Sequence, residues 1–148
     1  MAPSPLLEIT NPNVEFSARK RVIRALRNVN LKIPKGGIVG VVGESGCGKS
    51  TLILSIMRLL ASNARVTGGE VMFGGRNLLA ISEREMQSVR GNEISMIFQD
   101  PLTSLNPVIS IGQQLIDVQY RDATSRKEKS QRAIDALAQV GIPDASTR

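Results

Sequence analysis

Histidine and tryptophan are absent from this sequence, and cysteine occurs only once, at position 47. Without histidine, the 148 residues offer no imidazole base, pH switch or metal ligand. A single cysteine excludes an internal disulfide and is typical of a reducing compartment. Aromatic residues make up 3% of the chain, which is too few for platforms that stack single-stranded nucleic acid. The net charge of +6 is therefore interpreted as a solvated basic face, and no nucleic-acid partner is expected.

Long apolar runs are also missing. No run approaches the length that crosses a bilayer, and the start, Met1–Pro5, lacks the charged-then-apolar layout of a signal peptide. Hydrophobic residues still account for 41% of the chain, and the mean hydropathy is −0.04. These values predict one domain, or a piece of a larger one, that buries a core and resides in the cytoplasm.

A glycine-rich stretch at positions 43–51 fits the pattern G-x-x-x-x-G-K-[ST] at every fixed position. Glycines at this spacing let successive backbone N–H groups approach phosphate oxygens. Lys49 would then reach the β- and γ-phosphates, and the hydroxyl of Ser50 would ligate Mg²⁺. The predicted nucleotide-binding residues are Gly43, Glu44, Ser45, Gly46, Cys47, Gly48, Lys49, Ser50 and Thr51. Cys47 is either an alkylation target or simply a small loop residue.

The flanks of this loop have the order that a nucleoside triphosphate site requires. A β-branched run, Ile38–Val42, precedes the loop and predicts a strand, whereas Thr51–Leu60 predicts a helix. The partial positive charge at the start of that helix favours an anion beside Lys49.

The remaining elements indicate an α/β fold with an antiparallel layer before the loop. Strands are predicted over Leu6–Thr10, Asn13–Phe16, Ala25–Ile33, Gly69–Phe73 and Glu93–Phe98. Helices are predicted from about Ser82 to Arg90, from Ile111 to about Tyr120, and from about Ser125 to Val140. Two of them begin with capping boxes, Ser82-x-x-Glu85 and Ser125-x-x-Glu128.

A second motif narrows the interpretation. It reads Ser95-Met96-Ile97-Phe98-Gln99-Asp100-Pro101-Leu102-Thr103-Ser104-Leu105-Asn106-Pro107. Taken with the loop at 43–51, this motif resembles the ATP-binding subunits of ABC transporters, within the oligopeptide, dipeptide and nickel importer group. The resemblance implies a P-loop NTPase fold that binds ATP and Mg²⁺. It further implies an antiparallel β layer over about 1–36, a RecA-like nucleotide-binding core over 37–98, and a glutamine loop with the start of a helical subdomain over 99–148.

The resemblance also assigns roles to single residues. Gln99 would act with Lys49 in catalysis, its amide oxygen on Mg²⁺ and its NH₂ toward a water. Phe16 would stack on adenine, although a simple core phenylalanine is an equal alternative. Residues 102–107 would face a membrane permease. A second ATP-binding subunit would complete a dimer, and the protein would lie on the inner face of the plasma membrane.

The sequence departs from that family in three motifs. It contains no Leu-Ser-Gly-Gly-Gln signature, no apolar strand ending in Asp-Glu, and no switch histidine. In the family these motifs contact the γ-phosphate, support Mg²⁺ and polarise the attacking water. We therefore expect an N-terminal fragment that ends before the signature, binds nucleotide weakly and hydrolyses it negligibly.

Two other functions stay open at this point. A small stand-alone kinase or GTPase-like enzyme would use Asp100 to support Mg²⁺, but Gln99 and Pro101 interrupt the expected pattern. A non-catalytic module that occupies the dimer face of a full-length relative is the third hypothesis. The leading interpretation remains the ATP-binding portion of a transporter ATPase that imports peptides or related small solutes.

Overall fold

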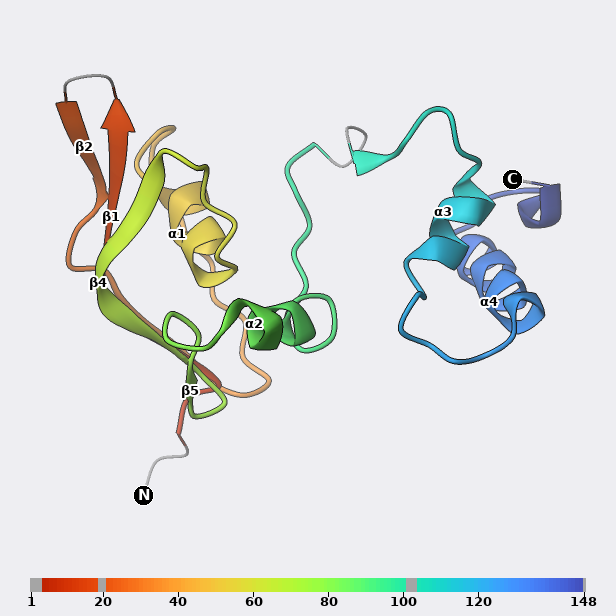
Figure 1. Cartoon of the computed structure of the whole chain (residues 1–148), viewed down its shortest axis with the longest axis horizontal. Helices are drawn as coiled ribbons and strands as arrows, with labels where there is room; N and C mark the ends of the chain where they lie inside the picture. The colour runs from red at the N-terminus through yellow and green to blue at the C-terminus, as the bar shows by residue number, and fades with distance from the viewer. Residues whose placement is uncertain (1–3, 19–20, 101–103, 148) are drawn as a thin grey trace. The chain divides into compact units, whose positions relative to one another are not determined.

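The structure is a computed structural model, and it describes residues 4–18, 21–100 and 104–147. The chain divides into two compact units, Met1–Met96 and Ile97–Arg148. Each unit is described by itself below (Figure 1). The division of the chain into three parts at residues 36 and 98 stays a prediction.

The first unit contains an antiparallel sheet of five strands. These are β1 (Leu7–Ala18), β2 (Arg21–Leu26), β3 (Asn30–Ile33), β4 (Ala64–Phe73) and β5 (Arg76–Asn77). The order is β2-β1-β4-β5, and β3 pairs with the first half of β1 while β2 pairs with its second half. The long strands β1 and β4 lie side by side at the centre (Figure 1). The antiparallel sheet therefore also includes residues 64–77.

Two predicted boundaries in this sheet were wrong. The turn-prone pair Asn11-Pro12 does not separate two strands, because β1 absorbs it as an irregularity between Thr10 and Val14. Conversely, the stretch Ala25–Ile33 is not one strand. Asn28 has a φ of +50°, a left-handed conformation that ends β2 and lets β3 begin two residues later.

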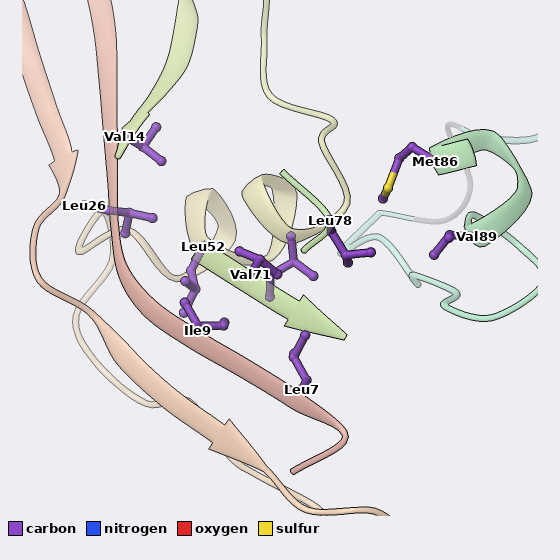
Figure 2. Packing of buried hydrophobic residues seen from close by; sticks show 10 residues of the cluster. Leu7, Ile9, Val14, Leu26, Leu52, Val71, Leu78, Met86 and Val89 are labelled. Atoms are coloured by element: carbon purple, nitrogen blue, oxygen red, sulfur yellow. The ribbon is translucent and has the colours of Figure 1, made fainter. Parts of the chain in front are cut away.

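Two helices complete the first unit, α1 (Lys49–Ile56) and α2 (Glu83–Val89). The predicted capping box of α2 is confirmed, with Ser82 and Glu85 bonded reciprocally. One face of the sheet packs against both helices around a single buried cluster (Figure 2). The buried residues of this cluster are Leu7, Ile9, Val14, Leu26, Leu52, Ile56, Val71, Leu78, Met86 and Val89.

The predicted strands Ile38–Val42 and Glu93–Phe98 were wrong as well. Residues 38–42 and 95–98 have no strand hydrogen bonds, and 94 makes only an isolated bridge with 90. Ile38 is 100% exposed and Ile97 91% exposed. A strand is stable only beside neighbouring strands that pair with its edges. Among the described residues no segment pairs with either run.

The second unit is built from α3 (Ile111–Asp117), α4 (Arg126–Gln139) and the short 3₁₀ helix η2 (Ala145–Thr147). The predicted start of α4 is confirmed, because Ser125 and Glu128 form a second capping box. Ser110 caps α3 by accepting a hydrogen bond from the N–H of Gln113. Within the described part of the chain, none of the helices combines the length and the apolar character needed to span a membrane.

Candidate nucleotide-binding site

The glycine-rich loop ends in helix α1, as the sequence predicted, although no regular strand precedes it. Gly48 is the N-cap of α1 and has a φ of +100°. No side chain caps this end of the helix, and its first turn carries no acidic residue. The N–H groups of the first turn have no partner within the helix itself. This end of α1 therefore offers donors and a positive partial charge to an anion.

Lys49 places its ammonium group inside the curve of the loop. Its Nζ donates to the carbonyl oxygens of Gly43, at 2.8 Å, and Glu44, at 2.7 Å. It also lies 3.6 Å from the Sγ of Cys47, the one cysteine of the chain, which is exposed. The lysine thus closes the loop on itself and places a positive charge beside the uncapped start of α1. This arrangement has the charge and the donors that a phosphate group requires.

The end of β2 contacts the loop at Gly48, which the sequence did not predict. A Cβ at Gly48 would lie 2.9 Å from the carbonyl oxygen of Ala25 and 3.0 Å from the Cδ2 of Leu26. The end of β2 therefore packs directly against the start of α1. No local pattern in the sequence announces this contact, because the two segments are distant in the chain and meet only through the sheet. The third glycine is required for space as well as for backbone conformation.

The remaining predicted site residues lie in different surroundings. Ser50 is exposed in the first turn of α1, where a hydroxyl could meet a cation bound to phosphate. Phe16 lies in β1 opposite Ile23 and Ala64, and its half-buried ring packs against the edge of the core cluster. Gln99 is exposed in the second unit. Its partnership with Ser50 around Mg²⁺ stays a prediction, as does adenine stacking by Phe16.

The surroundings of the loop fit a phosphate-bound cation better than a metal site made by the protein alone. Among the described residues, no group of three or more carboxylate or thiol side chains is arranged to hold a metal ion. A site for Mg²⁺ that uses Ser50 would thus need oxygens from the nucleotide itself, which is how phosphate-bound Mg²⁺ is usually held.

Comparison with known protein families shows which family the chain belongs to. A family model described as ABC transporter matches residues 26–148, which is most of the chain. The chain belongs to the ABC transporter family. The matched span includes the loop at 43–51 and the helices α1, α2, α3 and α4. Membership in the ABC transporter family disfavours the small stand-alone kinase or GTPase-like enzyme.

Curated ABC transporter relatives align with nearly the whole chain. A probable peptide ABC transporter ATP-binding protein of Sinorhizobium fredii is 48% identical over 97% of the chain and 43% of its own length. A dipeptide transport ATP-binding protein of Lactococcus lactis is 45% identical over 98% of the chain and 42% of its own length. The dipeptide transport ATP-binding protein of Escherichia coli K12 is 40% identical over 97% of the chain. The chain spans less than half the length of these relatives.

Solved structures confirm the expected fold. The dimeric structure of MJ0796, a bacterial ABC transporter cassette, superimposes with a TM-score of 0.74 at 29% identity. This match covers 89% of the chain and 56% of that protein. A second structure of MJ0796, in a post-hydrolysis state bound to ADP and Pi, gives a TM-score of 0.71 at 27% identity. The chain thus has the P-loop NTPase fold of an ABC ATPase cassette over the part that it spans.

Proposed function

We propose that this chain binds ATP together with Mg²⁺ and supplies the nucleotide-binding portion of an ATPase subunit that powers peptide import. The position of the Lys49 ammonium, inside the glycine loop and at the uncapped start of α1, carries the proposal. A phosphate oxygen would displace the thiol of Cys47 first, since sulfur is the weakest of the three acceptors that Lys49 contacts. The names of the peptide and dipeptide transport relatives support the substrate class.

Mg²⁺ would be held by the nucleotide phosphates and the hydroxyl of Ser50, with Gln99 as the second protein ligand. The metal would neutralise charge on the β- and γ-phosphates. Phe16 would stack on the adenine ring. Replacing Phe16 with alanine should then weaken binding of ATP but leave binding of inorganic tripolyphosphate, which lacks a base, unchanged. Equal losses for both ligands would exclude stacking.

The role of Ser50 is tested by the Mg²⁺ dependence of ATP binding. We expect Mg²⁺ to strengthen ATP binding by the unchanged chain, relative to binding in EDTA. The substitution Ser50→Ala should remove most of this increase, because Ser50 is the hydroxyl placed to ligate the metal. Ser45→Ala is the matched control: it removes a hydroxyl from the same loop, at a position without a metal role. An unchanged Mg²⁺ effect in Ser50→Ala would contradict the proposed metal site.

The proposed partners are a membrane permease and a second ATP-binding subunit, which would place the protein at the inner face of the plasma membrane. The segment after Gln99 would contact the permease, although residues 101–103 of this segment lie outside the described residues. Leu105 is 47% exposed and suits a test. In a Cys47→Ser background, a cysteine at Leu105 should cross-link to a peptide permease, whereas one at Lys127 should not. Equal cross-linking from both positions would contradict the assignment.

A further inference from the structure

Helix α1 buries one face, but the contrast between its buried and exposed faces is weak. Its sequence is Lys-Ser-Thr-Leu-Ile-Leu-Ser-Ile, and its buried face consists of Leu52, Ser55 and Ile56. Leu52 and Ile56 are buried, yet Ile53 is 43% exposed and equally apolar. A helix with some apolar side chains on its exposed side gains less from one particular rotation than a strongly amphipathic helix does. Directional contacts can therefore add to hydrophobic burial, and to the contact of Gly48 with β2, in orienting the N–H groups of its first turn.

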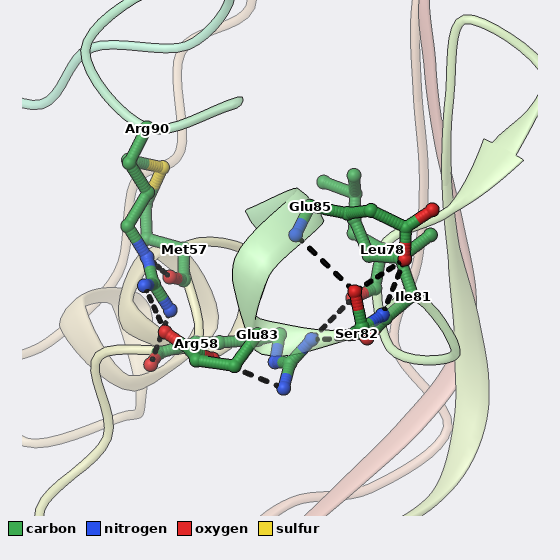
Figure 3. Close-up of polar contacts among 8 residues, drawn as sticks. All are labelled: Met57, Arg58, Leu78, Ile81, Ser82, Glu83, Glu85 and Arg90. Carbon is green, nitrogen blue, oxygen red and sulfur yellow. Dashed lines mark hydrogen bonds and ion pairs between the residues drawn. The ribbon is translucent and has the colours of Figure 1, made fainter. Parts of the chain in front are cut away.

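Directional hydrogen bonds exist at the opposite end of α1 (Figure 3). The guanidinium of Arg90 donates from Nε to the carbonyl oxygen of Met57, at 2.8 Å, and from Nη2 to that of Arg58, at 3.2 Å. Carbonyls at the end of a helix have no partner within it and carry a negative partial charge. Arg90 satisfies two backbone carbonyls just after α1 at once. The planar fork of arginine holds both in a fixed orientation.

A carboxylate ties this contact to the rest of the unit. Glu83 accepts from Arg90 at Oε1 and lies 3.2 Å from the Nη2 of Arg58 at Oε2. The hydrogen bond from Arg90 is the main cause that lowers the pKa of Glu83 below its ordinary value. Arg58 in turn donates to the carbonyl oxygen of Ile81, at 2.7 Å. The two arginines and Glu83 thus join the end of α1 to α2 and to the segment before it.

Helix α2, which leads into Arg90, is anchored in the core. Met86 and Val89 of α2 are fully buried in the core cluster. The backbone N–H of Arg90 donates to the carbonyl oxygen of Met86, at 3.0 Å. Arg90 therefore projects from an anchored helix toward the end of α1.

We infer that Arg90 is a positioning residue for the nucleotide site: by fixing the rotation of α1, it sets the direction of the N–H groups at Lys49, Ser50 and Thr51. The inference rests on the proposed nucleotide binding. Arg90 acts through the helix and does not touch the phosphates. Its loss should weaken the binding of phosphate groups, whether or not adenine is attached.

The test compares Arg90→Gln with Arg76→Gln, using ATP and inorganic tripolyphosphate as ligands well below the unfolding temperature. Arg76 is the matched control, since it lies in β5 and also pairs with a glutamate, Glu93. Arg90→Gln should weaken the binding of both ligands about tenfold, which is the effect of losing one charged hydrogen bond. Arg76→Gln should change neither by more than about twofold. Arg90→Lys should recover part of the loss, because an ammonium can cap one carbonyl but not both.

The second readout needs no ligand. The amide resonances of Lys49, Ser50 and Thr51 should shift in Arg90→Gln and stay in place in Arg76→Gln, measured by ¹⁵N NMR on the folded chain. Unmoved resonances in Arg90→Gln would overturn the inference, and so would equal loss of ligand binding in both variants. If the unchanged chain binds no ATP, the proposed function fails, whereas the resonances still test the role of Arg90. If Arg90→Gln does not fold, Arg90→Lys is measured instead, with a smaller shift expected.

Discussion

Gly48 combines two demands at the residue scale, a left-handed backbone and close contact with β2. We expect Gly48→Ala to lower the free energy of unfolding by about 2–3 kcal/mol, because an alanine Cβ meets both backbone strain and the carbonyl of Ala25. Gly46→Ala is the control, since Gly46 has a φ of +80° but no heavy atom within 4 Å of an added Cβ. It should cost only about 1–2 kcal/mol, the backbone term alone. Urea unfolding measures both, and equal losses would contradict the packing of β2 on the loop.

The chemistry of single residues was partly readable from the sequence. The loop pattern at 43–51 predicted correctly that a helix follows the loop, because that pattern encodes local backbone geometry, although α1 spans Lys49–Ile56 where Thr51–Leu60 was predicted. The contact of Gly48 with Ala25, and that of Arg90 with Met57, could not be read, because both depend on how distant segments pack. The surroundings of Phe16 were left as two alternatives, and the half-buried ring is compatible with either.

At the scale of elements, the N-cap of α4 gives a direct prediction. Ser125→Ala should lower the free energy of unfolding of the second unit by about 1 kcal/mol, because the N–H of Glu128 loses its acceptor. Ser130→Ala, inside the same helix, should instead raise the free energy of unfolding by roughly a few tenths of a kcal/mol, because alanine has the higher helix propensity. Circular dichroism during urea unfolding distinguishes the two. A neutral Ser125→Ala would contradict the capping box.

The stability that this cap gives to α4 should depend on pH. The hydrogen bonds from Ser125 lower the pKa of Glu128 below its ordinary value of 4.5. A carboxyl group whose pKa is lowered on folding stabilises the fold above its ordinary pKa and loses this contribution as pH falls through the lowered one. Helicity of α4 should therefore be constant above about pH 5 and fall below about pH 4. Ser125→Ala should flatten this acid-side loss, and an identical pH profile in that variant would contradict the explanation.

Elements coded by a few adjacent residues were predicted well, whereas elements that need distant partners were not. Both capping boxes lie within four residues, and both are confirmed. The runs Ile38–Val42 and Glu93–Phe98 have the composition of strands, yet a strand forms only beside a neighbour. Composition indicates the strand propensity of such a run but not whether a neighbouring strand is available to pair with it.

On the scale of the whole molecule, the extended run before Gln99 should be the weak point of the chain. Phe98 is 47% exposed and makes no strand hydrogen bonds, whereas Phe16 and Phe73 lie inside the sheet. Brief digestion with chymotrypsin should therefore cut after Phe98 before it cuts after Phe16 or Phe73, because proteases need a segment that opens freely. Phe98→Ala should remove this early product. Protection of Phe98 equal to that of Phe73 would instead favour the strand that the sequence predicted.

The central claim is that the loop at 43–51 binds the phosphates of ATP through Lys49. It is tested most directly by the equilibrium binding of ATP with Mg²⁺ to the purified chain, compared with Lys49→Ala and with Lys35→Ala, which removes an exposed lysine outside the loop. The account predicts that Lys49→Ala weakens binding by at least about tenfold, because a charge-assisted contact to phosphate is lost, while Lys35→Ala binds as the unchanged chain does. Equal binding by Lys49→Ala and the unchanged chain would contradict the account.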